Sequence, residues 1–182
     1  MQTKEIPTKW HVITGGPCTG KTTVIELLRQ MGHKTTIEHA RHYIDTMQQQ
    51  GASVEQIRAN KRRFQRGVLE MQIEEENTLN PNDTVFLDRA LPDAMAYYRF
   101  LGLEFDHDLI EMCNRFCYQT VFILDRLPLV NDYARREDEE EQKRIHDLII
   151  EVYRSFPCLV VFVPVLPPNE RVEFILKNAL RP

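Results

Sequence analysis

The sequence lacks three features that would indicate its class at once: a large charge of one sign, a long apolar run and a paired-cysteine motif. A net charge of −4 gives no electrostatic reason to expect a nucleic acid as the main partner. The longest apolar run, 159–163, is too short to span a membrane. Residues 1–9 are polar and lack the apolar core of a signal peptide, which favours a cytoplasmic location.

Four cysteines are scattered along the chain without a Cys-x-x-Cys pair, so the sequence does not predict a zinc site. Cys113 and Cys117 lie four residues apart in a segment with a helical pattern, where both would face the same way. We interpret them as reduced, partly or fully buried thiols, because free cysteine behaves as a small apolar residue. No repeat or linker divides the chain, so we expect one domain over residues 1–182.

Short apolar runs alternate with longer helical patterns, which predicts a parallel sheet with helices on both faces. The expected strands are 10–14, 34–38, 84–87, 120–124 and 159–163. The expected helices are 21–30, 40–50, 53–79, 93–101, 106–116, 137–155 and 169–180. The pair Ser53 and Gln56 has the spacing of a capping box at the start of the long helix. Because a strand, a glycine-rich loop and a helix follow one another, the pattern is typical of nucleotide-binding α/β folds.

The segment Gly15 to Thr22 matches the phosphate-loop pattern G-x-x-x-x-G-K-[ST]. Glycines let such a loop curl so that its N–H groups point at phosphate oxygens, and the following helix adds its positive dipole end. Lys21 is expected to contact the β- and γ-phosphates, and the Thr22 hydroxyl is expected to bind Mg²⁺. The expected nucleotide-binding residues are Gly15, Gly16, Pro17, Cys18, Thr19, Gly20, Lys21, Thr22 and Thr23. The sequence therefore predicts a site for a nucleoside triphosphate with magnesium.

Two polar residues end the third expected strand. Asp88 is placed to be the second carboxylate that a triphosphate site uses to hold magnesium, although it could instead cap the next helix. Arg89 could contact a phosphate or substrate oxygen, or could form an ordinary salt bridge. Both residues are candidates for the catalytic site.

Glu38 ends the second expected strand, at the sheet edge that also holds the phosphate loop. A carboxylate there can accept the proton of a substrate hydroxyl as that oxygen attacks the γ-phosphate. It could equally cap the helix that begins near residue 40. The neighbouring His39, Arg41 and His42 are interpreted as surface residues.

A polar segment at 126–137, between a strand and a helix, resembles the lids of small-molecule kinases. Arg135 and Arg136 are candidates to stabilise charge on a transferring phosphoryl group. The acidic run 137–141 is interpreted as negative charge at a helix N-terminus. The basic residues of the long helix could bind an anionic substrate, although a solvated helix face is the simpler interpretation. They are Lys61, Arg62, Arg63 and Arg66.

Three segments, 12–23, 38–44 and 86–98, together resemble the ATPase/kinase-like AAA-domain family, to which the ribosylnicotinamide kinase domains are related. The Glu-x-Ala-Arg-x-Tyr-Ile and Asp-Arg-x-x-x-Asp pieces carry most of this resemblance. It implies an α/β P-loop NTPase of the nucleoside and nucleotide kinase type, with a five-stranded parallel sheet. It also implies ATP or GTP with Mg²⁺, and a phosphoryl-transfer pocket over Glu38, Asp88 and Arg89.

Two functions are compatible with these features. The first is a small-molecule kinase that transfers the γ-phosphate to a hydroxyl of a nucleoside-like acceptor. The second is a nucleotide-dependent switch or binding module that acts through a protein or lipid partner. The sequence has no Asn-Lys-x-Asp guanine motif, which disfavours a Ras-like GTPase but leaves the choice between ATP and GTP open.

Overall fold

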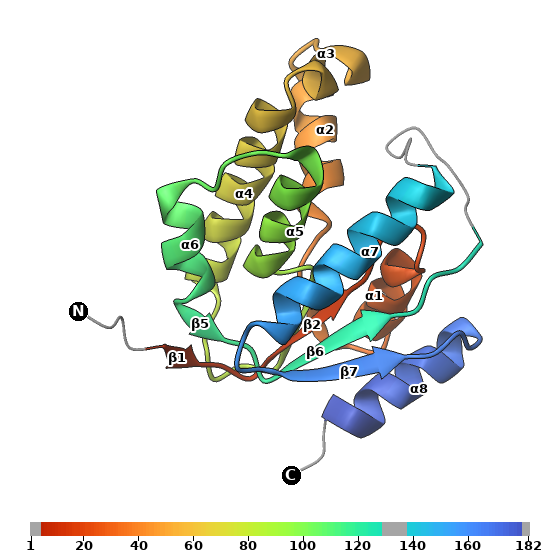
Figure 1. Cartoon of the computed structure of the whole chain (residues 1–182). Helices are drawn as coiled ribbons and strands as arrows, with labels where there is room; N and C mark the ends of the chain where they lie inside the picture. The colour runs from red at the N-terminus through yellow and green to blue at the C-terminus, as the bar shows by residue number, and fades with distance from the viewer. Residues whose placement is uncertain (1–4, 129–137, 180–182) are drawn as a thin grey trace.

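The computed structural model describes residues 5–128 and 138–179 and is built around a five-stranded parallel sheet (Figure 1). The strand order is β3-β4-β2-β6-β7. The strands are β3 (Lys34–Thr35), β4 (Val85–Asp88), β2 (Trp10–Thr14), β6 (Thr120–Leu124) and β7 (Leu159–Val163). All the pairings are parallel, so the carboxyl ends of the strands meet at one edge.

Helices cover both faces of this sheet, as the alternating pattern predicted. Neighbouring strand residues point to opposite faces, so Val12 packs towards α5 (Leu91–Leu101) and α7 (Glu139–Arg154). Its neighbour Ile13 packs towards α1 (Lys21–Gln30) and α8 (Pro168–Ala179). Both faces of the sheet are covered, and every residue of β2, β4 and β6 is buried, which explains why these strands are mostly apolar and do not alternate with exposed polar residues.

The remaining helices form a second layer beyond α5, away from the sheet (Figure 1). These helices are α2 (His39–Gln49), α3 (Val54–Ala59), α4 (Lys61–Thr78) and α6 (His107–Cys113). The expected single helix over 53–79 is therefore wrong, because it is interrupted at Asn60. Asn60 has φ −101° and ψ 91°, and its side chain accepts a hydrogen bond from the Arg63 N–H, which caps a new helix. The predicted capping box of Ser53 and Gln56 is confirmed.

Two short strands, β1 (Ile6–Pro7) and β5 (Phe116–Cys117), pair in parallel and were not predicted. Cys113 ends α6 whereas Cys117 lies in β5, so the expectation that one helix carries both thiols is wrong. The chain leaves the helix because the Arg115 carbonyl accepts a hydrogen bond from the Ile6 N–H. Within the described residues, no helix is both long and apolar enough to cross a membrane.

Glu76 is a fully enclosed carboxyl group on α4 that joins three elements. Its Oε1 accepts a hydrogen bond from the Leu91 N–H at the start of α5, and its Oε2 accepts one from the Tyr118 hydroxyl. Burial raises the pKa of Glu76 to about 8, although both hydrogen bonds lower it. The interior therefore favours the protonated form of this side chain.

This raised pKa predicts a pH-dependent stability. Between the ordinary value of 4.5 and about 8, the folded chain holds a proton on Glu76 that the unfolded chain releases. The contribution of Glu76 to the free energy of unfolding must then decrease as the pH rises through this window. Glu76→Gln keeps both hydrogen-bonding positions without a charge, so at pH 8 it should be more stable than the parent by a few kcal/mol, as an order of magnitude.

Urea unfolding at pH 5 and pH 8 measures this effect, with Glu74→Gln, an exposed position on the same helix, as the control. The difference in free energy of unfolding between Glu76→Gln and the parent should grow from pH 5 to pH 8. An equal difference at both pH values would show that Glu76 is ionised in the folded chain.

Candidate nucleotide and acceptor site

The phosphate loop lies between β2 and α1, at the carboxyl edge of the sheet. Gly15 has φ 143°, and a Cβ atom there would lie 2.8 Å from the Leu124 carbonyl oxygen, so only glycine fits. Gly20 has φ 81° at the N-cap of α1. These two positions explain why the pattern requires glycine at each end of the loop.

Lys21 is buried at the centre of this loop. Its Nζ donates hydrogen bonds to the carbonyl oxygens of Gly15 at 3.1 Å and Gly16 at 2.7 Å. Thr22 and Thr23 follow in the first turn of α1 and are exposed. The loop thus gathers an ammonium group, a helix N-terminus and accessible hydroxyl groups at one place.

Helix α7 contacts the loop from the side of the sheet that faces α5. The Gly16 N–H donates to His146 Nδ1 at 3.1 Å, and Gln142 Nε2 donates to the Pro17 carbonyl oxygen at 2.7 Å. Burial lowers the pKa of His146, which favours the neutral ring that can accept this bond. A Cβ atom on Gly16 would lie 3.0 Å from His146 Cβ, so α7 packs closely against the loop.

Arg171 of α8 contacts the loop from the opposite side of the sheet. It is buried, and its Nη1 donates to the Thr19 carbonyl oxygen at 2.6 Å. Its Nε donates to the Pro164 carbonyl oxygen at 3.1 Å. The arginine therefore ties the phosphate loop to the segment that follows β7.

Asp88 ends β4 beside this loop, and Arg89 follows it. The Asp88 N–H donates to the Thr36 hydroxyl at 2.8 Å, while Asp88 Oδ1 is buried without a hydrogen-bond partner among the described residues. Burial and the charge of Glu38 raise the pKa of Asp88 to about 6, although Lys21 and Arg89 lower it. Asp88 therefore provides an enclosed carboxylate oxygen that a cation could use.

Asp93 fixes the orientation of Arg89. One of its oxygens accepts from Arg89 Nη1 at 2.8 Å and from the Thr14 hydroxyl. The other accepts from the Ala90 N–H at 3.1 Å and from the Tyr153 hydroxyl at 2.6 Å. With both oxygens engaged, Asp93 acts as an anchor for the arginine.

Glu38 lies at the N-cap position of α2 and not at the end of a strand. The expected strand 34–38 stops at Thr35, because Thr36 turns its hydroxyl towards β4 to accept from the Asp88 N–H. The Glu38 side chain makes no capping hydrogen bond to α2, and its Oε2 lies 3.4 Å from Arg41 Nε. The capping alternative therefore does not describe this side chain.

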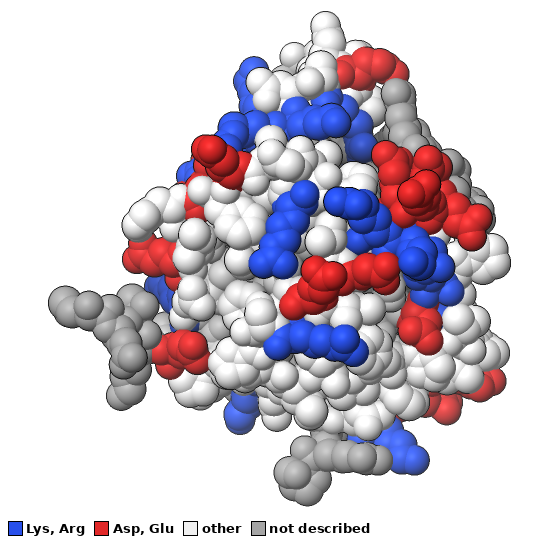
Figure 2. Space-filling view, in the orientation of Figure 1, with Lys and Arg blue, Asp and Glu red and all other residues white. Residues whose placement is uncertain are grey.

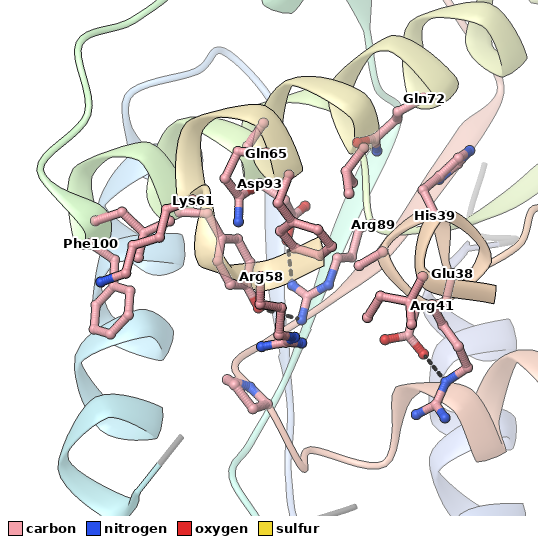
Figure 3. A pocket seen from close by; sticks show the side chains of 18 of the residues that line it. Glu38, His39, Arg41, Arg58, Lys61, Gln65, Gln72, Arg89, Asp93 and Phe100 are labelled. Carbon is pink, nitrogen blue, oxygen red and sulfur yellow. Dashed lines mark hydrogen bonds and ion pairs between the residues drawn. The ribbon is translucent and has the colours of Figure 1, made fainter. Parts of the chain in front are cut away.

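Glu38, Asp88 and Arg89 line one cavity of about 370 Å³ between α2, α4 and α5 (Figure 3). Pro17 of the phosphate loop is also part of its wall. His39 and Arg41 line it too, so their interpretation as surface residues is wrong. The structure thus brings the expected strand-end residues together beside the loop.

The lid residues Arg135 and Arg136 lie outside the described residues. Of the basic residues of the long helix, Arg62 pairs with Asp106 at 2.8 Å and Arg66 pairs with Asp108 at 2.6 Å, as a solvated helix face would. Lys61 instead lines the cavity. Figure 2 shows a band of basic side chains across the upper part of this face, with acidic side chains close to it.

Sequence reasoning missed several polar residues of the site, because each lies on a helix whose apolar stripe seemed to explain it. They are Gln65, Gln72, Gln142, His146 and Arg171, and all five are buried. The available signal was their position: a polar residue on the buried stripe of a helix needs a partner there. Asp93 ends the Asp-Arg-x-x-x-Asp piece of the family resemblance, but no role in the site was predicted for it.

Residues 10–171 match the family model described as an AAA domain, so the chain belongs to this family. No curated protein matches the sequence. The similarity to solved structures confirms the α/β fold of the nucleoside and nucleotide kinase type.

Three solved structures illustrate this fold. Thymidylate kinase from Ehrlichia chaffeensis is 16% identical, with a TM-score of 0.63, over 97% of this chain and 100% of that chain. Deoxyadenosine kinase from M. mycoides is 16% identical, with a TM-score of 0.57, over 93% of this chain and 97% of that chain. The NadR protein in complex with NR is 18% identical, with a TM-score of 0.65, over 95% of this chain. This chain spans 50% of NadR, and the match shows that the two share a fold.

Arg171 should be required for the shape of the phosphate loop. Arg171→Met removes the donor that holds the Thr19 carbonyl, so nucleotide affinity should decrease by about tenfold or more. The free energy of unfolding should decrease by about 1–3 kcal/mol, because buried carbonyl groups lose their donor. Calorimetric titration with ATP and thermal unfolding measure the two effects.

Lys177→Met, an exposed position on the same helix, is the matched control and should change neither quantity. Equal ATP affinities for Arg171→Met and the parent would show that the loop keeps its shape without the arginine.

Proposed function

We propose that this chain is a magnesium-dependent phosphotransferase that moves the γ-phosphate of ATP or GTP to a hydroxyl group of a nucleoside-like acceptor. One observation carries the proposal: a cavity adjoins the phosphate loop and is lined by Glu38, Asp88 and Arg89. Its volume of about 370 Å³ lies within the range of small-molecule sites. A nucleotide-dependent switch needs no such second site beside the phosphates, so the cavity favours the phosphotransferase.

The structural relatives support the choice of a nucleoside-like acceptor. Deoxyadenosine kinase was solved with dCMP and dCDP, and NadR with NR. These proteins share the fold of this chain at 16% and 18% identity. The acceptor assignment for this chain depends on its own cavity.

The reaction assigns a separate task to each residue. The acceptor hydroxyl transfers its proton to Glu38 as its oxygen bonds to the γ-phosphorus and the bond to the β–γ bridging oxygen breaks. Lys21 balances charge on the phosphate oxygens, and Arg89 stabilises charge on the phosphoryl group in transit. The ion pair with Asp93 at 2.8 Å keeps Arg89 in one orientation during this step.

Magnesium fits the donor set at this edge of the sheet. Asp88 supplies an enclosed oxygen without a partner among the described residues, and Thr22 supplies an accessible hydroxyl group. Oxygen donors of these two kinds are what Mg²⁺ prefers, and we assign both residues to hold it. When bound, the ion would neutralise negative charge on the phosphates.

Glu38→Gln tests the transfer reaction. The variant should lose about 10²- to 10⁴-fold in turnover, because an amide cannot accept the hydroxyl proton. Its ATP affinity should stay within about twofold of the parent, since the side chain faces the acceptor cavity. The assay is release of labelled ADP from ATP across a panel of nucleosides and ribosides. Glu26→Gln, an exposed position on α1, is the control and should keep full turnover.

Lys21→Ala completes this experiment, because it should abolish binding of the triphosphate. Absence of acceptor-dependent ADP release from the parent chain across the whole panel would refute the kinase. A turnover that depends on a partner protein alone would instead support the switch.

The raised pKa of Asp88 predicts how the effect of Mg²⁺ on ATP affinity depends on pH. Above about pH 6 Asp88 is charged and can bind the ion, whereas below it a proton competes. The gain in ATP affinity on adding Mg²⁺ should therefore increase from pH 5 to pH 7.5. In Asp88→Asn this gain should be about tenfold smaller at pH 7.5.

Titration of ATP with and without Mg²⁺ at both pH values measures the effect. Asp83→Asn, in the turn before β4 at the opposite end of that strand, is the matched control. If Mg²⁺ increased the ATP affinity of Asp88→Asn as much as it increases that of the parent, Asp88 would not be a ligand of the metal.

A further inference from the structure

Two glutamines of α4 line the cavity in addition to the charged residues at its inner end. Gln65 and Gln72 lie seven residues apart, so they occupy the same face of the helix. Only 8% of Gln65 and 4% of Gln72 is exposed. Figure 3 shows both side chains leaving this helix on the side of Arg89 and Asp93.

Gln72 has a polar atom that the described chain leaves unsatisfied. Its Nε2 is buried and has no hydrogen-bond partner among the described residues. An unpaired amide donor in the interior is destabilising, and folded proteins retain few of them. A turn about the last side-chain bond, which is a soft torsion, presents this nitrogen to a molecule in the cavity. The unpaired donor therefore indicates a missing hydrogen-bond acceptor.

The walls near the glutamines indicate the shape and charge of that molecule. Phe64, Tyr97 and Phe100 contribute aromatic rings, and Val68 and Ala94 add aliphatic surface. Flat apolar walls with a few placed amides suit a planar ring whose edge carries neutral polar atoms.

Two arginines that line the cavity already lie beside carboxylates. Arg89 is paired with Asp93 at 2.8 Å, and Arg41 lies 3.4 Å from Glu38. In Figure 3 these pairs lie together, and Lys61 and Phe100 lie at the other end of the view. Beyond Lys61, the part of the wall that α4 contributes has as its polar groups the neutral amides of Gln65 and Gln72, which favours an uncharged ring.

We propose, on the basis of the function proposed above, that the acceptor carries a neutral planar heterocycle with a carbonyl oxygen or ring nitrogen on its edge. Gln72 donates a hydrogen bond to this atom, and Gln65 supplies a second donor and acceptor to the same edge. The heterocycle packs among the aromatic rings, and the reacting hydroxyl lies towards Glu38. Gln65 and Gln72 are then the residues that select the ring.

Calorimetric titration of the full chain, saturated with ADP and Mg²⁺ to fill the phosphate-loop site, tests the proposal. The probes are the common ribonucleosides and deoxynucleosides, with nicotinamide riboside as the probe with a positively charged ring and methyl riboside as the probe that lacks a base. At least one probe with a neutral base should bind, and it should bind more tightly than nicotinamide riboside or methyl riboside. Gln72→Met has nearly the same volume and should reduce the affinity for that probe by roughly 5- to 100-fold, with ADP affinity unchanged.

A second measurement separates recognition from a structural role. Gln72→Met removes an unpaired donor, so the free variant should unfold at a higher temperature than the parent, whereas a structural glutamine would give a lower one. Gln65→Met provides an independent second variant, and Gln48→Met, an exposed position on α2, should bind the probe as the parent does.

Three results would overturn the proposal: no probe with a neutral base binds, nicotinamide riboside or methyl riboside binds as tightly as that probe, or both Gln65→Met and Gln72→Met bind like the parent. Binding that depends on Gln72 without any phosphorylation by ATP would support this inference and refute the transferase. Phosphorylation of a sugar that lacks a base would support the transferase and refute this inference.

Discussion

The buried carboxylate of Asp93 connects the parts of the chain that form the site. It accepts hydrogen bonds from Thr14 at the end of β2, from Ala90 and Arg89 after β4, and from Tyr153 on α7. A carboxylate is stable in the interior only when its oxygens are paired, and here each oxygen accepts two hydrogen bonds. The two central strands, α5 and α7 are therefore held in one arrangement by the same group.

This arrangement holds Arg89 in a backbone conformation that its local preference does not favour. Arg89 has φ 66°, an unfavourable conformation for a residue with a side chain, and its N–H donates to the Ile13 carbonyl. The strain is offset by the bonds from its guanidinium to Asp93 and Tyr97. A guanidinium fixed in this way does not need to be ordered again when a phosphoryl group approaches, which lowers the entropic cost of binding.

The phosphate loop shows how far local sequence determines the site. Gly15, Gly20 and Lys21 could be assigned from the pattern alone, because the backbone angles and the helix start impose those residue types. The contacts from His146 and Arg171 could not, since they come from positions more than a hundred residues away. Their placement depends on how α7 and α8 pack, which no short pattern encodes.

The same distinction applies to the helices and the cavity. The strands in the sheet centre were predicted to within a residue, because burial on both faces requires continuous apolar runs. The break at Asn60 was missed, since the side chain that caps α4 looks like an ordinary polar residue within a long helical pattern. Without that break the expected helix would run straight, and the walls formed by α3 and α4 could not be anticipated.

Asp88 Oδ1 and Gln72 Nε2 are buried polar atoms of the cavity wall for which the described residues offer no hydrogen-bond partner. One is an acceptor beside the phosphate loop and the other is a donor on α4. Two other buried carboxyl groups are satisfied, as the paired oxygens of Glu76 and Asp93 show. Folding alone would favour replacement of both residues by apolar ones. Their presence in one cavity, with opposite hydrogen-bonding character, is what a site for a cation at one end and a neutral ring edge at the other requires.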